Sequence, residues 1–241
     1  MQLITTKDYQ DMSRIAANII AAQITLHPRS VLGLATGSTP LGIYQQLVQR
    51  HQAGDIDFAQ IRSVNLDEYC GLAPDHPNSY HYYMWENLFR HVNVKPENVH
   101  IPDGLAEDVA AECARYERLI EGLGGIDLQL LGLGENGHIG FNEPAESFTT
   151  VTHQVELDEQ TIVSNSRLFA SVDEVPRSAI TMGIKAIMQA RKVILVVNGV
   201  RKAAILKKAL YGPVTPRVPA SILQLHPDVT VVADAEALSE I

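Results

Sequence analysis

The sequence is poor in cysteine and has no long apolar run. Only Cys70 and Cys113 occur among its 241 residues, so a disulfide framework and a CxxC metal motif are both excluded. No apolar run approaches the roughly 20 residues that would cross a bilayer. The first residues also lack the basic and apolar regions of a signal peptide. We therefore expect a protein of the reducing cytoplasm.

An excess of positive charge is also missing. The net charge is −9, so nothing global attracts nucleic acid or an anionic membrane, and we expect neither as a partner. An anionic small molecule would need a local basic cluster. The length suits one well-buried domain, and no linker or internal repeat divides the chain.

Apolar segments that look like strands alternate with amphipathic segments that look like helices. This alternation predicts an α/β fold with a doubly wound, mostly parallel sheet flanked by helices (Rossmann-like). We expect a single domain over residues 1–241, with a lid at 145–172 and a weak strand at 150–157. The other expected strands are 31–36, 61–66, 126–133, 192–197 and 229–232, and the expected helices are 6–26, 41–50, 79–91, 106–123, 175–190, 200–211 and 220–224.

The most informative stretch runs from Ile126 to Pro144. Residues 126–133 are almost continuously apolar, as in a strand that is buried on both faces. Four glycines follow within nine residues, and His138 and Glu143 lie among and after them. Glycines allow a sharp bend and a close approach to a ligand. Ligands of open α/β sheets bind beyond the carboxyl ends of the strands, so we expect a site here.

The glycines from Gly132 to Gly137 match a dinucleotide-binding fingerprint, G-x-G-x-x-G. That motif should open a helix, but Gly140 and Pro144 make a poor helix start. We therefore expect no nicotinamide cofactor, and no cofactor of another kind. The nine histidines show no HxxxH spacing, so we expect no metal site either.

The turn from Thr36 to Pro40 follows a predicted strand and precedes a predicted helix. Backbone N–H groups and the helix dipole favour an anion such as phosphate at such a place. The other interpretation is an ordinary loop in which Ser38 or Thr39 merely caps the helix. The local pattern leaves both open.

Several titratable residues fall at the same predicted edge. Asp67 can be a general base, an N-cap or a surface charge, and Glu68 is its immediate rival. His138 can move a proton near neutral pH with Glu143 as its partner, or it can be a satisfied buried histidine. The basic side chains that could bind phosphate, or be ordinary surface residues, are Arg167 and Lys202.

Taken in order, these motifs resemble the glucosamine-6-phosphate deaminase family, also called glucosamine-6-phosphate isomerases. The resemblance extends over nearly the whole chain, and the run from Gly137 to Pro144 is its most specific part. The matching segments are 34–40, 65–69, 132–144, 165–167, 202–203 and 221–227.

The resemblance implies a reaction in which glucosamine 6-phosphate and water give fructose 6-phosphate and ammonia. It implies that Asp67 moves a proton between C2 and C1 and that His138 opens the pyranose ring. Asn136 and Glu143 would support the histidine. The residues implied to hold the phosphate are Gly37, Ser38, Thr39, Arg167 and Lys202.

Two features depart from the family pattern. Many members carry Asp in place of Asn136, and an amide supplies no charge, so His138 should be less basic here. Larger members bind an allosteric activator, N-acetylglucosamine 6-phosphate, through basic residues after the Asn-Glu-Pro run, but residues 145–155 contain no Arg or Lys. The chain also ends at Ile241, short of their C-terminal extension. We expect no such activation, and a monomer or small homo-oligomer.

Other functions remain open. A 6-phosphogluconolactonase-like hydrolase could use ring chemistry at His138 but has no need of an enolising base at Asp67. A non-catalytic sugar-phosphate sensor need not keep either residue, and no basic helix-turn-helix segment precedes residue 30. A dinucleotide oxidoreductase would rest on the glycine match alone.

Overall fold

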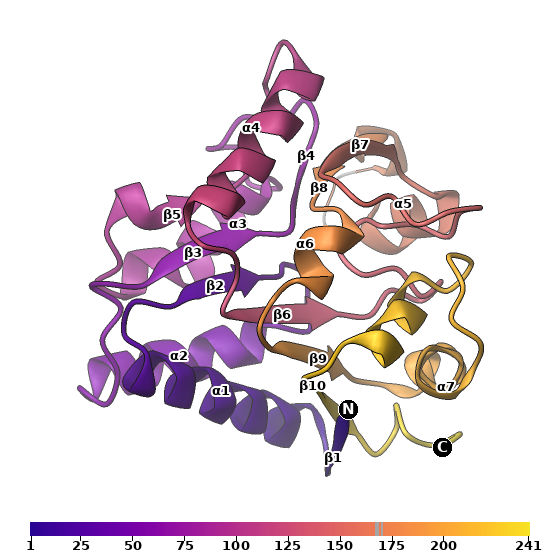
Figure 1. Ribbon diagram of the computed structural model, residues 1–241, viewed down its shortest axis with the longest axis horizontal. Coiled ribbons are helices and arrows are strands. Elements are labelled where there is room, and N and C mark those ends of the chain that lie inside the picture. Colours follow the sequence, from indigo (N-terminus) through magenta and orange to yellow (C-terminus); the bar gives the residue numbers. More distant parts are fainter. Residues whose placement is uncertain (167–168, 170) are drawn as a thin grey trace.

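A computed structural model gives the arrangement of the chain and describes every residue except 167, 168 and 170. A seven-stranded sheet crosses the molecule with helices on either side, and a second, three-stranded sheet stands above it in Figure 1. All strand pairs of the larger sheet are parallel. The prediction of a doubly wound, mostly parallel α/β fold is therefore confirmed.

The order of the seven strands reverses in the middle of the sheet. From β2 the chain moves outward to β3 and β5, and from β6 it moves the other way to β9 and β10. The reversal lies between β2 and β6, where ligands of such sheets bind. In spatial order the strands are β1 (Gln2–Thr6), β10 (Val229–Asp234), β9 (Val193–Val197), β6 (Leu128–Gly132), β2 (Val31–Leu34), β3 (Arg62–Asn65) and β5 (Val99–His100).

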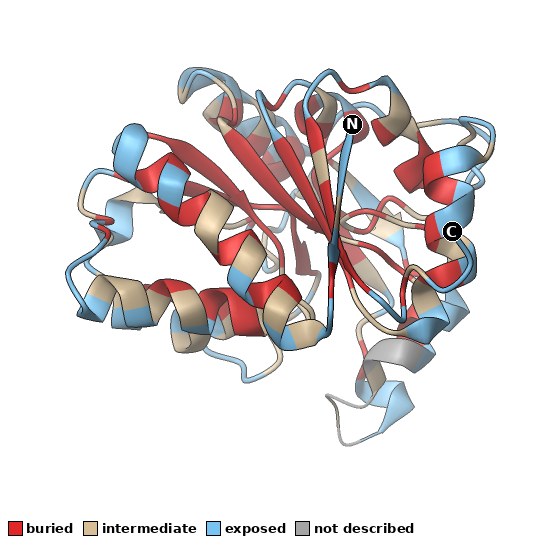
Figure 2. Cartoon of the chain, turned by 90° about the horizontal axis from the view of Figure 1, so that it is seen from below, coloured by how far each residue is buried: buried red, intermediate tan, exposed pale blue. Residues whose placement is uncertain are grey.

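The helices cover the sheet with their apolar faces, and Figure 2 shows the strands between them as largely buried. Helices α1 and α2 pack side by side below the sheet in Figure 1. The helices are α1 (Tyr9–Leu26), α2 (Leu41–Gln52), α3 (Tyr80–Asn87), α4 (Val109–Gly122), α5 (Glu159–Asn165), α6 (Ile184–Met188) and α7 (Ala203–Tyr211). Short 3-10 helices include η1 (Phe89–His91), η5 (Val200–Lys202) and η6 (Pro219–Leu225).

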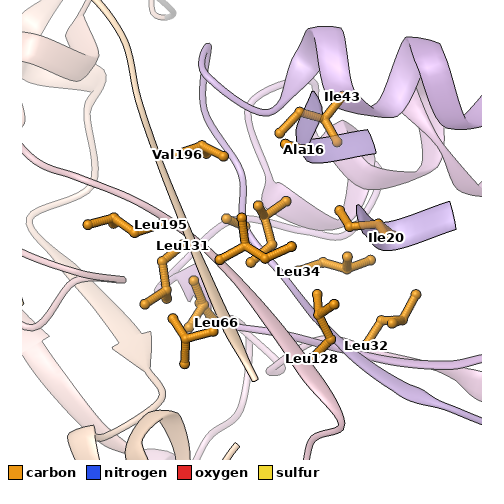
Figure 3. Packing of buried hydrophobic residues seen from close by; sticks show 14 of the residues in the cluster. Ala16, Ile20, Leu32, Leu34, Ile43, Leu66, Leu128, Leu131, Leu195 and Val196 are labelled. Atoms are coloured by element: carbon orange, nitrogen blue, oxygen red, sulfur yellow. The ribbon is translucent and has the colours of Figure 1, made fainter. Parts of the chain in front are cut away.

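One continuous apolar core joins α1 and α2 to the sheet. Ala16 and Ile20 of α1 belong to one cluster with Leu32 and Leu34 of β2, which are both at most 2% exposed (Figure 3). Ile43 of α2 belongs to the same cluster. Burying one such side chain stabilises the fold by about 1.5–3 kcal/mol. The helices thus hold the centre of the sheet, and with it the ends of β2 and β6.

The second sheet is antiparallel, with the order β4 (Asp67–Tyr69), β8 (Ser178–Thr181) and β7 (His153–Glu156). Because β4 follows β3 after a single residue, Asp67 is both just past the parallel sheet and first in the antiparallel one. It lies opposite Thr181 of β8. A separate apolar cluster around Tyr69, Tyr80 and Phe141 packs against this sheet.

The predicted helix over 175–190 is wrong. Its first half forms β8, and only Ile184–Met188 is helical. Strand β8 pairs with β4 on one side and β7 on the other, and these long-range pairings override the local helical pattern. The short strands β1, β4 and β5 were not predicted.

The alternative in which Ser38 or Thr39 caps α2 does not match the structure. The N-cap of α2 is Pro40, which makes no side-chain hydrogen bond to the helix. Neither Ser38 nor Thr39 caps the helix. Thr39 Oγ1 instead donates to Asn198 Oδ1 at 2.9 Å, across to the loop after β9.

The segment 145–172 is more ordered than a bare loop in the parts that the structure describes. It contains β7, which is paired with β8, and α5, which Asp158 caps through Gln160 N. Whether this segment moves as a lid stays a prediction. Among the described helices, none is long and apolar enough to cross a membrane.

Candidate active site

The candidate site lies where β2, β3, β6 and β9 end. The loops there bring together residues that are far apart in the sequence: Gly37, Ser38, Thr39, Asp67, Asn136, His138, Glu143 and Lys202. These are the predicted site residues except Arg167, which lies outside the described residues. The sheet order thus places the predicted anion turn and both predicted proton-transfer groups at one edge.

A shared carboxylate organises the loop after β6. Glu143 Oε2 accepts a hydrogen bond from Asn136 Nδ2 at 2.6 Å and lies 3.2 Å from His138 Nδ1. Asn136 Oδ1 in turn accepts from the backbone N–H of His138 at 3.2 Å. With Nδ1–H donating to Glu143, the neutral imidazole leaves Nε2 for exchange of a proton. The predicted pairing of His138 with Glu143 and Asn136 is therefore present in the structure.

Sequence reasoning missed a third partner of this carboxylate. Thr161 of α5, which is 3% exposed, donates through Oγ1 to Glu143 Oε1 at 2.6 Å. Its hydroxyl is also 3.5 Å from His138 Nδ1. Both oxygens of Glu143 thus have donors, one set from the β6 loop and one from α5. No sequence pattern links Thr161 to a glutamate eighteen positions earlier, so only the fold reveals the contact.

These donors keep Glu143 ionised. Burial acts to raise the pKa of Glu143, but hydrogen bonds from His138, Thr161 and Asn136 outweigh it and lower the pKa below the ordinary value. A permanent carboxylate beside Nδ1 orients the ring and stabilises the imidazolium that forms when Nε2 takes a proton. Asn136 contributes geometry but no charge.

Gly134 provides the space for the imidazole. A Cβ atom at this position would lie 2.4 Å from His138 Nε2 and 2.4 Å from Cδ2, well inside contact distance. A Cβ atom at Gly132, by contrast, would meet nothing within 4 Å. One glycine of the apparent dinucleotide motif is therefore needed by the histidine ring, and not by a pyrophosphate.

The environment of Asp67 is the opposite of that of Glu143. Asp67 is 5% exposed, and among the described residues none donates a hydrogen bond to its carboxylate. Burial first, and the negative charge of Glu68 second, raise the pKa of Asp67 to about 8. A carboxyl group that changes protonation near neutral pH is suited to taking a proton from carbon and returning it.

Glu68, the other carboxylate considered for the role of Asp67, binds backbone groups of the fold. Its carboxylate accepts backbone N–H groups from Tyr69 and Tyr80 at 2.8 and 2.9 Å and from His81 at 2.8 Å. It therefore anchors the first turn of α3 to β4. Burial raises the pKa of Glu68 to about 7 against the lowering effect of these hydrogen bonds.

The loop of His138 is tied to the strand of Asp67 through β8. Thr181 Oγ1 accepts the N–H of Phe141 at 3.0 Å, and Thr181 is the register partner of Asp67. Between them is Gly140, with φ +58°; a Cβ there would lie 3.0 Å from Thr181 Oγ1 and 3.5 Å from Asp67 Oδ2. The two proton-transfer groups thus lie on either side of one tight turn.

The predicted anion turn is linked to the loop that carries Lys202. The hydrogen bond from Thr39 to Asn198 joins the two loops. Asp234, at the end of β10, accepts the N–H of Gly199 with both carboxylate oxygens at 3.0 and 3.1 Å, and so holds the turn before Lys202. Asn198 and Asp234 were not predicted as site residues. Their contacts join the loop before Lys202 to the turn.

Nothing in this donor set resembles a metal centre. Among the residues that the structure describes, no group of three or more His, Cys, Asp or Glu side chains could hold a metal ion. Cys70 and Cys113 are free thiols, and burial raises the pKa of both. Neither sulfur is activated as a nucleophile.

The fold and the site together define a class: a doubly wound α/β enzyme that binds an anionic small molecule and moves protons on it. A sequence model described as glucosamine-6-phosphate isomerases/6-phosphogluconolactonase matches residues 7–232. The chain therefore belongs to this family.

Within this family, the chain is more similar to glucosamine-6-phosphate deaminases than to a 6-phosphogluconolactonase. A glucosamine-6-phosphate deaminase of Lachnoclostridium phytofermentans is 62% identical over 96% of this chain and 98% of its own. The solved structure of a monomeric glucosamine-6-phosphate deaminase has a TM-score of 0.98 and 49% identity, with 100% of both chains covered. A 6-phosphogluconolactonase from Trypanosoma brucei has a TM-score of 0.79 at 20% identity, covering 100% of this chain and 98% of its own, which shows a common fold alone.

We predict that Gly134→Ala abolishes most activity while the protein stays folded, because the new methyl group displaces the His138 ring. The matched control is Gly132→Ala, two residues earlier at the end of β6, where a Cβ meets nothing within 4 Å. Turnover and urea unfolding of both variants are the measurements. Equal activity of the two variants would show that the His138 ring does not need the space beside Gly134.

Proposed function

We propose that this protein converts glucosamine 6-phosphate and water into fructose 6-phosphate and ammonia. The observation that carries the proposal is the pair of differently tuned groups at one edge, a buried Asp67 and the His138–Glu143 pair. Close relatives across the whole chain carry the name of this activity. A lactonase or a sugar-phosphate sensor would leave the buried carboxylate of Asp67 without a role.

Ring opening is the task of His138. Its Nε2 takes the proton of the anomeric hydroxyl and returns one to the ring oxygen, so the C1–O5 bond breaks. Glu143 stabilises the imidazolium in between, since it remains a carboxylate. The side chain of His138 is 18% exposed, so a ligand can reach it, while that of Glu143 is 9% exposed.

Asp67 performs the isomerisation. It removes the proton from C2 of the open aldehyde form and delivers it to C1, while the substrate ammonium loses a proton and the aldehyde oxygen gains one. The aldehyde at C1 thereby becomes an alcohol, and the amine at C2 becomes an imine. Water adds to C2, the C2–N bond breaks, and ammonia leaves. The positive charge on the substrate amine favours the ionised form of Asp67 when the substrate binds. No cofactor takes part in this sequence.

The phosphate group binds at the turn of Gly37, Ser38 and Thr39, with Lys202 and Arg167 supplying positive charge. The link between Thr39 and Asn198 supports a common site for the turn and the lysine loop. Backbone N–H groups at the start of α2 and a cation together suit a dianion. In this proposal Arg167 belongs to the segment 145–172, which acts as a lid over a single domain of residues 1–241.

The proposal extends to assembly and location. A monomer or small homo-oligomer is supported by a structural relative described as monomeric. A reducing cytoplasm suits the two free thiols. The only molecular partner that the chemistry requires is the sugar phosphate.

The first test is the reaction itself. Incubation with glucosamine 6-phosphate should give ammonia and fructose 6-phosphate in equal amounts, and Asp67→Asn should lower kcat/KM by about 10²–10⁴-fold. Because Asp67 must be ionised in the free enzyme, and burial holds its pKa at about 8, kcat/KM should rise with pH up to about 8. Asp75→Asn, at an exposed loop position, is the control. Undiminished ammonia from Asp67→Asn, or a profile flat from pH 6 to 9, would contradict the mechanism.

Thr161→Val should lower kcat by about tenfold, because a buried oxygen of Glu143 loses its donor and the imidazole loses its fixed orientation. Thr161→Ser keeps the hydroxyl and should restore most of the rate, with KM little changed in either variant. Steady-state kinetics of both variants provide the measurement. A valine variant as active as the serine variant would remove Thr161 from the network.

N-acetylglucosamine 6-phosphate should leave the rate curve hyperbolic and unchanged. A cavity of about 330 Å³ lies behind the turn from Asn142 to Pro144, and no lysine or arginine is among the described residues that line it. Glu156 and Glu143 face it instead, so an anionic activator has no counter-charge there. A sigmoidal curve that this compound makes hyperbolic would refute the prediction.

A further inference from the structure

Three tyrosine hydroxyls bind the backbone of the anion turn. Tyr44 donates to the carbonyl of Ala35 at 2.5 Å and Tyr83 to the carbonyl of Gly37 at 2.6 Å. Tyr9 donates to the carbonyl of Ser38 at 3.1 Å. Three of four consecutive carbonyl groups, at residues 35, 37 and 38, thus point toward tyrosines. Such a concentration is unlike an ordinary loop, whose carbonyls face water.

The three tyrosines come from three different helices. Tyr9 begins α1, Tyr44 is in α2 and Tyr83 is in α3. The hydroxyl of Tyr9 also accepts the N–H of Gly42 in the first turn of α2 at 2.8 Å, so it joins the turn to the helix that follows. Burial raises the pKa of Tyr44 and of Tyr83 above the ordinary value, which keeps both hydroxyls protonated as donors.

Holding a carbonyl also sets the direction of the next N–H group. In a trans peptide the C=O and the following N–H point in opposite directions. The bond from Tyr83 to Gly37 O therefore orients the N–H of Ser38, and the bond from Tyr9 to Ser38 O orients the N–H of Thr39. Gly37 has φ +101°, a conformation that other residues rarely adopt, so the turn needs external restraint to keep one shape.

We propose that Tyr83 and Tyr9 are positioning residues for the phosphate of the substrate: they hold the carbonyls of Gly37 and Ser38 toward the helices, so that the N–H groups of Ser38 and Thr39 face the anion. The proposal deepens the proposed function and rests on its assignment of the phosphate to this turn. Neither tyrosine needs to touch the ligand.

Helix α3, which carries Tyr83, connects the anion turn to the proposed general base, Asp67. Glu68 accepts the N–H groups of Tyr80 and His81, which fixes the start of α3 beside Asp67. Tyr83 is one turn further along α3 and reaches Gly37. Helix α3 thus acts as a spacer between the phosphate turn and the carboxylate.

The test compares Tyr83→Phe and Tyr9→Phe with Tyr82→Phe. Tyr82 is adjacent on α3 and 37% exposed, and its hydroxyl holds none of these carbonyls. Binding of inorganic phosphate is measured by isothermal titration calorimetry, and KM and kcat for glucosamine 6-phosphate by steady-state kinetics. We expect Tyr83→Phe and Tyr9→Phe to weaken phosphate binding and raise KM by about three- to tenfold, the factor equivalent to one hydrogen bond. The kcat should be little changed, and Tyr82→Phe should match wild type.

Urea unfolding shows whether each variant is folded under assay conditions, and the two positions provide independent tests of the same turn. Unchanged phosphate affinity in both variants would overturn the proposal, as would a fall in kcat without a rise in KM. Failure of wild type to bind phosphate would also overturn it. Failure of wild type to release ammonia from glucosamine 6-phosphate, with phosphate binding still dependent on Tyr83, would instead count against the proposed function.

Discussion

The site depends on the hydrogen bonds that the carboxylate of Glu143 accepts. This carboxylate joins the loop after β6 to helix α5, because one oxygen accepts from Asn136 and faces His138 while the other accepts from Thr161. Without it the imidazole has no fixed tautomer and no counter-charge. Gly134 is needed for the same reason, since it leaves space for the imidazole ring that Glu143 orients.

The pKa values of two carboxyl groups in the candidate site are shifted in opposite directions. Hydrogen bonds overcome burial at Glu143 and lower its pKa, whereas burial and a neighbouring negative charge raise the pKa of Asp67 to about 8. In the proposed mechanism the first remains charged and supports a histidine, and the second exchanges a proton. Environment alone separates the two roles. Gly140 and Thr181 connect the loop of Glu143 to the strand of Asp67, so the two carboxyl groups have different surroundings in neighbouring parts of the chain.

Much of the fold could be predicted from local pattern. The uninterrupted apolar runs of β6 and β9 predict strands that are covered on both faces, and parallel order then brings their carboxyl ends together. The clustering of His138 and Glu143 among glycines predicts a site there. The structure brings Asn136 and His138 to Glu143 there, and it links the Thr36–Pro40 turn to the loop before Lys202 through Thr39 and Asn198.

The remainder depends on contacts that local sequence does not encode. Residues 178–181 have a helical pattern but form a strand, because β4 and β7 pair with it from distant parts of the chain. Thr161 reaches Glu143 through the packing of α5. The tyrosines that hold the anion turn belong to three helices, so each reads as an ordinary apolar-face residue until the fold is known.

In the proposed mechanism one buried carboxylate, Asp67, both removes the proton from C2 and delivers it to C1. The most direct measurement follows deuterium placed at C2 of glucosamine 6-phosphate into the product by NMR. Because Asp67 is shielded from water, part of the label should appear at C1 of fructose 6-phosphate with wild type, and Asp67→Asn should form almost no labelled ketose. Complete loss of the label to water with wild type, or undiminished transfer by Asp67→Asn, would contradict the account.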